Sequence, residues 1–251
     1  MATFIRTVLL CCLPALAGSL HADDSSGKFT IYMNGKPMAH ETYSIQRSDG
    51  KITIDGSGAA DMGLLKINIE DFRVVTNESY KPLEASAKAQ MGKASMSATT
   101  TFADNTASSQ VDTGHGPETK EIAIHGDDVV ISSNLPIFPW SLLAPRVKLD
   151  SSEPQQFYAF ILGQAEAPLT VTAKGQEPVE FANRTIKLNH LFGSMTPPSG
   201  QPINADIWVD VNRRIIKMVV PTQNVEVYQE GFERKAPPEP KPDAEQKPDK
   251  P

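Results

Sequence analysis

The chain has 251 residues, and its 24 basic and 30 acidic residues give a formal net charge of −6. A mildly acidic surface argues against nucleic acid and against anionic lipid headgroups as main partners. Both cysteines, Cys11 and Cys12, lie in the first apolar run, so the chain beyond them has no thiol. Disulfides, cysteine-ligated zinc and thiol nucleophiles are therefore excluded from that part.

The first 22 residues have the three parts of a secretory signal peptide. Arg6 precedes an apolar run over residues 8–16, and small residues lead from there to Ala22. We expect cleavage after Ala22, with cleavage after Ser19 as the alternative. The apolar run is shorter than the roughly 20 residues that a spanning helix needs, and no later run approaches that length. In a bacterial host, this pattern predicts a periplasmic or secreted protein that is not integral to the membrane.

Residues 23–234 predict one β domain, because short alternating segments are separated by turn residues. Asn34-Gly35 and Asp49-Gly50 are strong hairpin turns. Residues 105–118 are polar and contain glycine, and we expect a loop there. Strands are expected over residues 28–33, 37–47, 51–55, 64–76, 80–89, 93–102, 121–125, 129–131, 156–162, 169–173, 179–181, 185–191 and 225–228.

Residues 134–146, which we call the lid, break this alternation. They are mostly apolar and contain prolines at 136, 139 and 145, which denies the segment a place inside a sheet. Pro139 is suited to start a short helix over residues 140–144, which Pro145 would end. We expect the lid to close the concave side of a curved sheet.

Residues 207–220 predict a β-hairpin with its turn at Asn212-Arg213, since Asn tolerates the positive φ that such turns need. Trp208 is out of phase with the apolar positions, so it faces outward or toward a second layer such as the lid. Residues 235–251 are rich in proline and in charges of both signs, and we expect a disordered or extended tail. The positions expected to face the core are Ile207, Val209 and Val211 before the turn and Ile216, Met218 and Val220 after it.

Two stretches resemble a known group of proteins. The lid contains Phe-Pro-Trp-Ser-Leu-Leu-Ala-Pro-Arg over residues 138–146, and Trp208-Val209-Asp210 is followed by Arg214-Ile215. Together with the even strand spacing, they resemble exported bacterial domains of unknown function that are similar to the lipoprotein-localisation-factor half-barrel. The resemblance covers roughly residues 134–228. It implies a strongly curved antiparallel sheet, as a half-barrel or open barrel, round a short helical plug, and it supplies no catalytic residues.

No catalytic or metal-binding motif is written in the sequence. The histidines beyond residue 22 are His40, His115, His125 and His190, and none lies two or four residues from another. Gly56-Ser57-Gly58 lacks the spacing and the following helix of a nucleophile turn. We therefore expect no enzyme, no metal and no cofactor. An enzyme would require the dispersed histidines to converge in the fold.

The sequence leads to two hypotheses of different classes. In the first, a non-enzymatic periplasmic protein holds an apolar ligand, a lipid or a lipoprotein segment on the concave face of the sheet, under the lid. In the second, a structural or scaffolding envelope protein binds a partner protein through its proline-rich tail. The candidate ligand-binding residues of the first hypothesis are Leu135, Ile137, Phe138, Trp140, Leu142, Leu143 and Trp208.

Overall fold

The computed structural model describes residues 25–132, 136–198 and 200–235. The predicted signal peptide and the predicted tail beyond residue 235 lie outside these ranges, as does Leu135 at the start of the lid. Within them, the strands are β1 (Ser25–Met33), β2 (Lys36–Ser48), β3 (Lys51–Asp61), β4 (Lys66–Asn77), β5 (Pro82–Met91), β6 (Ala94–Ala103), β7 (Thr106–Asp112), β8 (Pro117–Ala123), β9 (Val129–Ser132), β10 (Gln155–Ile161), β11 (Ala165–Glu180), β12 (Thr185–Met195), β13 (Ile203–Val209), β14 (Ile215–Val220) and β15 (Val225–Gln229).

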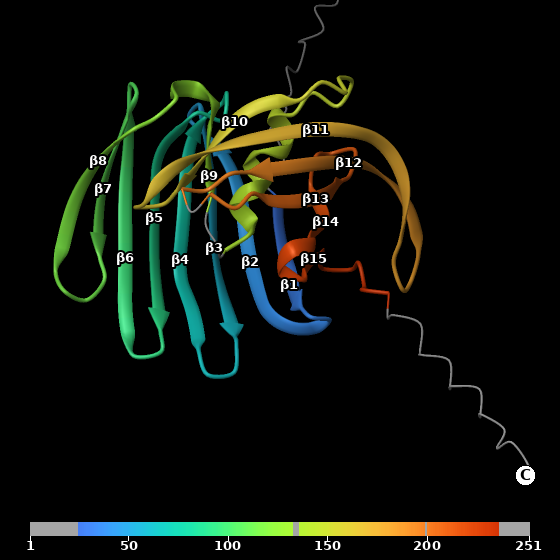
Figure 1. Cartoon of the computed structure of the whole chain (residues 1–251), viewed down its shortest axis with the longest axis horizontal. Helices are drawn as coiled ribbons and strands as arrows, with labels where there is room; N and C mark the ends of the chain where they lie inside the picture. Colours follow the sequence, from blue (N-terminus) through green and yellow to red (C-terminus); the bar gives the residue numbers. More distant parts are fainter. Residues whose placement is uncertain (1–24, 133–135, 199, 236–251) are drawn as a thin grey trace, which may run out of the picture.

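These strands form one sheet of 15 strands within the described residues. β1 to β8 pair in chain order on one side, β15 back to β9 pair on the other, and β1 joins β15 in the middle. Every pair is antiparallel except β9 with β10. Figure 1 shows β10–β13 crossing the direction of β2–β6, so the sheet curves round on itself. The predicted curved, mostly antiparallel β fold is confirmed.

The sheet does not close into a complete barrel. β8 and β9 follow each other in the chain, separated by the short 3₁₀ turn η1 (Gly126–Asp128), yet they occupy the two opposite ends of the strand order. In the described part of the chain they share no backbone hydrogen-bond ladder. The fold is therefore an open barrel with two free edges.

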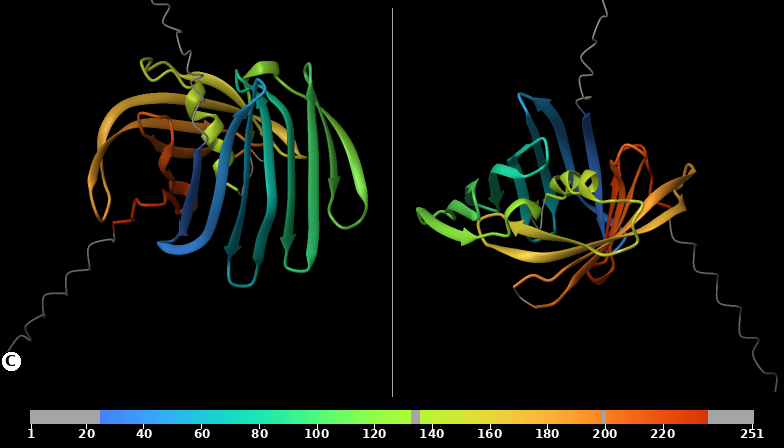
Figure 2. Two further views of the ribbon diagram at one scale, coloured as in Figure 1. Left: turned by 180° about the vertical axis from the view of Figure 1, so that it is seen from behind. Right: turned by 90° about the horizontal axis from the view of Figure 1, so that it is seen from above.

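The lid lies inside the curve of the sheet rather than over its opening, as Figure 2 shows from above. It forms two 3₁₀ turns, η2 (Phe138–Leu142) and η3 (Ala144–Arg146), in place of the single predicted helix over residues 140–144. Phe138 is fully buried, with its ring 5.9 Å from Tyr43 and 5.7 Å from Phe72. The lid thus fills part of the barrel interior as core.

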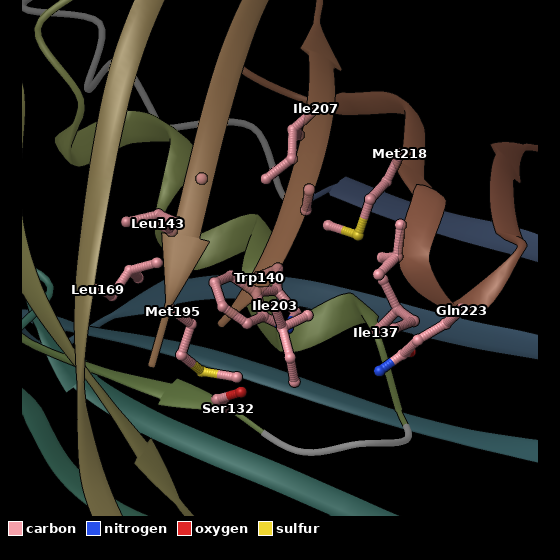
Figure 3. A pocket seen from close by; sticks show the side chains of 13 residues that line it. Ser132, Ile137, Trp140, Leu143, Leu169, Met195, Ile203, Ile207, Met218 and Gln223 are labelled. Carbon is pink, nitrogen blue, oxygen red and sulfur yellow. The ribbon is translucent and has the colours of Figure 1, made fainter. Parts of the chain in front are cut away.

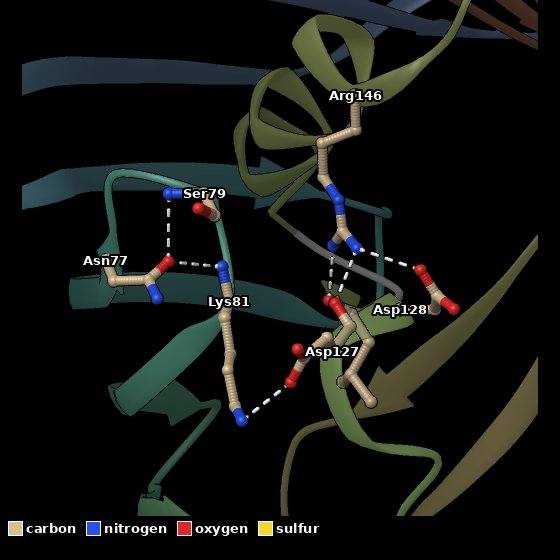
Figure 4. A network of polar contacts seen from close by, with 7 residues as sticks. Asn77, Ser79, Lys81, Asp127, Asp128 and Arg146 are labelled. Carbon is tan, nitrogen blue, oxygen red and sulfur yellow. Dashed lines mark hydrogen bonds and ion pairs between the residues drawn. The ribbon is translucent and has the colours of Figure 1, made fainter.

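The far end of the lid is held by a polar network, shown in Figure 4. Arg146 donates to the backbone oxygens of Val129 and Asp127, each at 2.6 Å, and lies 3.7 Å from the Asp128 carboxylate. Lys81, in the β4–β5 turn, forms an ion pair of 2.6 Å with Asp127. This network ties the lid to η1 and to the first half of the sheet.

Three predictions about the strands and their turns were also wrong. Residues 105–118 are not a loop: they contain β7 and the start of β8, where Ala107 is buried and Thr100 bonds Ser109 at 2.8 Å. The separate strands expected at 169–173 and 179–181 are one long strand, β11, with an irregularity near Ala173.

The third difference concerns the hairpin of β13 and β14, which is present but turns differently. Arg213 rather than Asn212 has the positive φ, and Val211 is exposed in the loop. Ile207 pairs with Met218 but Val209 pairs with Ile215, so the register shifts between them. This bulge turns Ile216 to the convex face, where it joins an outer cluster instead of the main core. The outer cluster consists of Val179, Phe181, Leu188, Ile216 and Tyr228.

Candidate functional site: an apolar hollow on the concave face

The space that the lid leaves unfilled contains an apolar hollow of about 280 Å³, which we call the smaller hollow. Ile137, Trp140 and Leu143 of the lid form one wall (Figure 3). The opposite wall comes from β11 to β14, with Leu169, Met195, Ile203, Ala205, Ile207 and Met218. Ser132 and Gln223 are the polar side chains of its lining. The surface is therefore suited to hydrocarbon rather than to a charged group.

A larger hollow, of about 660 Å³, lies beside it, between the first half of the sheet and the β10–β11 turn. It shares Ile137, Val220 and Gln223 with the smaller hollow, so the two meet beside the lid. Lys120 is the ionisable residue of its lining. The rest is mostly apolar, including Ile31, Ile67, Ile69, Phe72, Ala87, Ala89, Ala98, Val111, Ile161 and Leu162.

Methionine side chains line both hollows. All seven methionines among the described residues line one of the two hollows. The larger hollow has Met33, Met38, Met62, Met91 and Met96, and the smaller has Met195 and Met218. Methionine is unbranched and polarisable, so it adapts to irregular or variable apolar surfaces. Sequence reasoning missed this set. The available signal was methionine just before the turn glycine in Met62-Gly63 and Met91-Gly92.

Glu41 fixes the start of the lid. Its buried carboxylate accepts the backbone N–H of Ile137 through both oxygens at 2.9 Å and that of Phe138 at 3.2 Å. Burial raises the pKa of Glu41 to about 7, and the two backbone hydrogen bonds only partly offset this. Glu41 thus sets the position of Ile137, which lines both hollows. The sequence analysis did not single it out.

The structure brings only some of the sequence-predicted site residues together. Ile137, Trp140 and Leu143 line the smaller hollow, whereas Phe138 and Leu142 are buried in the core and line neither hollow. Leu135 lies outside the described residues.

Trp208 lies on the convex face, packed against the outer cluster. Its indole donates to Glu177 at 2.6 Å and stacks on His190 at 4.9 Å, and the Lys217 ammonium is 4.8 Å from its ring. These contacts place Trp208 in a surface packing cluster, away from the hollows.

Three of the histidines form hydrogen bonds at separate places in the fold. His125 bonds the Glu166 carboxylate, His190 bonds Asp206 at 2.8 Å, and His40 bonds Thr30 at 3.3 Å, so these three histidines have different partners. Within residues 25–132, 136–198 and 200–235, no three His, Cys, Asp or Glu side chains gather as a metal site would require. In the same ranges, no helix has both the length and the apolar character of a membrane crossing.

Comparison with known proteins gives the fold and no function. No protein-family model matches the chain, and no curated protein matches it. A β-barrel-like protein of the domain of unknown function DUF1849 from Brucella abortus is similar, with a TM-score of 0.56 at 8% identity over 82% of this chain and 94% of that one. A DUF1089 family protein from Pseudomonas aeruginosa has a TM-score of 0.48 at 13% identity over 79% of this chain and 92% of that one. The β-barrel-like architecture is thus shared with the DUF1849 protein, whose domain has no known function.

Proposed function

We propose that the protein is an exported, non-enzymatic binding protein of the bacterial periplasm that holds an apolar ligand in its two hollows. The observation that supports this most is the larger hollow, because a volume of about 660 Å³ lies within the range of roughly 300–1,000 Å³ that is typical of ligand sites. The signal-peptide pattern of residues 1–22 supports the compartment.

The energetics favour an occupied hollow. Apolar surface in contact with water costs about 25 cal/mol per Å², so a hydrocarbon chain that covers this lining gains free energy along its whole length. The methionine side chains adjust their rotamers to the chain they meet, which favours a class of related ligands over a single shape. The ligand class that fits best is a lipid or the acyl chain of a lipidated partner.

The resemblance of the lid and the last hairpin to half-barrels of the lipoprotein-localisation-factor type supports the proposed compartment and the curved architecture. The lid then has a second purpose beside filling the core, because Ile137 and Trp140 form the floor on which a bound chain would lie.

Tryptophan fluorescence offers a direct test, because the chain has two tryptophans and Trp140 lines the smaller hollow. The Trp208→Phe variant leaves Trp140 as the reporter. Titration with lysophosphatidylcholine, below its micelle concentration, should give a saturable blue shift of its emission.

A matched pair of variants locates the binding. Ala89 lines the larger hollow, and Ala89→Phe should weaken lysophosphatidylcholine binding about tenfold or more, since the ring takes the space of the chain. Ala103→Phe, at the exposed end of β6, should leave the affinity unchanged. No saturable binding to the parent protein, or equal loss in both variants, would contradict the proposed function.

A further inference from the structure

The exposed apolar side chains of the protein are concentrated at one place. Among the described residues, the large hydrophobic side chains that stand exposed are Met62, Leu64, Met91 and Val211. The first three belong to two adjacent turns, since Ile67 pairs with Met91 and the Gly92 amide donates to the Lys66 oxygen at 2.9 Å. Leu64 is fully exposed at the tip of the β3–β4 turn. We call the β1–β2, β3–β4 and β5–β6 turns together the tip surface.

The tip surface adjoins the larger hollow. Met62 and Met91 are exposed and also belong to the lining of that hollow, as does Met33 at the β1–β2 turn. In Figure 1 the β3–β4 and β5–β6 turns stand at the lower edge of the molecule and project beyond β10–β15. A flat partner that meets the molecule from this side therefore touches the β3–β4 and β5–β6 turns first and lies at the entrance of the hollow.

The charge of the tip surface is opposite in sign to that of the whole chain. Each of the three turns carries one lysine, and these are Lys36, Lys66 and Lys93. The carboxylate of the tip surface is that of Asp61, 3.5 Å from the Lys66 ammonium. The net charge of −6 argued against anionic lipid headgroups because it averages over the whole molecule. Attraction to a surface acts over about one Debye length, roughly 8 Å at physiological salt, so the local lysines decide it.

We propose that the tip surface docks onto a bilayer that contains anionic phospholipid. Leu64, Met62 and Met91 enter the boundary between headgroups and acyl chains, and the three lysines lie among the headgroup phosphates. One apolar side chain or one lysine alone gives weak, reversible binding, and stable association takes both kinds of contact. The docked molecule presents the entrance of the larger hollow to the lipid, so an apolar ligand passes between them without crossing water.

Vesicle flotation tests this without reference to ligand binding. The chain from residue 23 onward is used, because the apolar run over residues 8–16 would itself bind lipid. It should float with vesicles of phosphatidylcholine and phosphatidylglycerol, and only weakly with phosphatidylcholine alone. Binding should fall as salt rises, since the lysine contribution is screened.

Leu64→Ser should lower the partition onto anionic vesicles about tenfold, because the exposed side chain would otherwise leave water on docking. Val211→Ser is the matched control. Asn224, which ends the β14–β15 connection, accepts from the Asn34 amide of the β1–β2 turn at 3.0 Å, so the β13–β14 loop with Val211 lies at the other end of the sheet. Both positions are exposed, so neither change should alter the melting temperature.

Replacing Lys36, Lys66 and Lys93 by glutamine should remove about 100-fold of the partition onto anionic vesicles and leave binding to neutral vesicles unchanged. Lys51→Gln, at the opposite end of β3, is the control. Equal loss in Leu64→Ser and Val211→Ser, or equal binding of the parent to neutral and anionic vesicles, would overturn the proposal. So would a dimer that Leu64→Ser dissociates without any vesicle binding, since the occupant of the tip surface would then be a second copy.

Discussion

Glu41 is a buried carboxyl group whose partners are backbone N–H groups of the lid. Its pKa of about 7 in the folded protein lies above the ordinary value of 4.5. The native protein therefore binds this proton more tightly than the unfolded chain does. Between these two values the unfolded chain has lost the proton and the native protein keeps it, so raising the pH through this window lowers the stability.

We predict that the parent protein loses about 3 kcal/mol of unfolding free energy from this group between about pH 4.5 and pH 8. Glu41→Gln, which does not titrate, should remove that slope. Glu84→Gln, at an exposed position of β5, should keep it. Urea unfolding at several pH values measures the difference. A parent stability that rises with pH relative to Glu41→Gln would show that Glu41 is ionised in the native state.

The sequence contained a signal that Glu41 is buried, but the alternation of apolar residues alone does not reveal it. Ala39, Glu41 and Tyr43 share the buried face of β2, so a glutamate stands in a row of core positions. A charged residue at such a position is ordinarily read as solvent-facing. Its role depends on the lid, which lies 96 residues away, and that proximity exists only in the fold.

At the scale of elements, the lid depends on a close approach to β3. Gly56 allows it, because a Cβ atom there would lie 2.5 Å from the Phe138 ring and 2.5 Å from the Thr42 oxygen. The Thr42 oxygen belongs to the backbone of the paired strand β2, so it cannot move aside as a flexible side chain would. The glycine is therefore the condition for seating Phe138 between Tyr43 and Phe72.

We predict that Gly56→Ala lowers the unfolding free energy by about 3 kcal/mol, as overpacking of a fitted core does. Gly193→Ala is the control, since a Cβ atom there would meet its neighbours only at 3.8 Å and beyond. It should change stability by less than about 0.5 kcal/mol. Thermal denaturation of both variants checks this. Equal effects would mean that the lid is loosely seated.

Sequence patterns predicted an element well where its own residues determine its structure. They predicted it poorly where its structure depends on pairing with a neighbouring strand. The prolines were sufficient to exclude the lid from the sheet, and alternation was sufficient to predict β13, because each pattern lies in the element's own residues. Most of β8 was not predictable, since nearly all its side chains are exposed and it is a strand only because it pairs with β7. The strand predicted over residues 121–125 overlaps only its last three residues. The phase of Ile216 depends on a bulge in β13–β14 pairing, which no periodicity in β14 shows.

At the scale of the whole molecule, the ends of the described chain lie in the middle of the sheet. β1 pairs with both β2 and β15, whereas β8 and β9 form the edges although they lie in the middle of the sequence. The order of local stability should therefore run opposite to the usual fraying of termini. The larger hollow also depends on the whole molecule, because its lining comes from strands of both halves of the sheet.

We predict that backbone amides of β1 and β15 exchange with deuterium most slowly and those of β8 most quickly. β1 and β15 have hydrogen-bonded neighbours on both sides and carry fully buried residues such as Ile31 and Val227, while β8 has one neighbour and is nearly all exposed. Hydrogen exchange followed by mass spectrometry measures this. Exchange over residues 25–33 as fast as over 117–123 would contradict the central position of β1.

An unclosed ring of strands has a mechanical property that a sealed barrel lacks. No ladder joins β8 to β9, so dilation of the ring breaks no strand pairing, but it must separate contacts between the two halves such as the Lys81–Asp127 ion pair and the packing of Phe102 against Phe160. η1 connects the two edges along the chain, and its Asp127 carries the ion pair to Lys81. We therefore expect the same chain to accommodate ligands of different width, with the gap between the two edges widening for a thicker ligand and narrowing when it leaves.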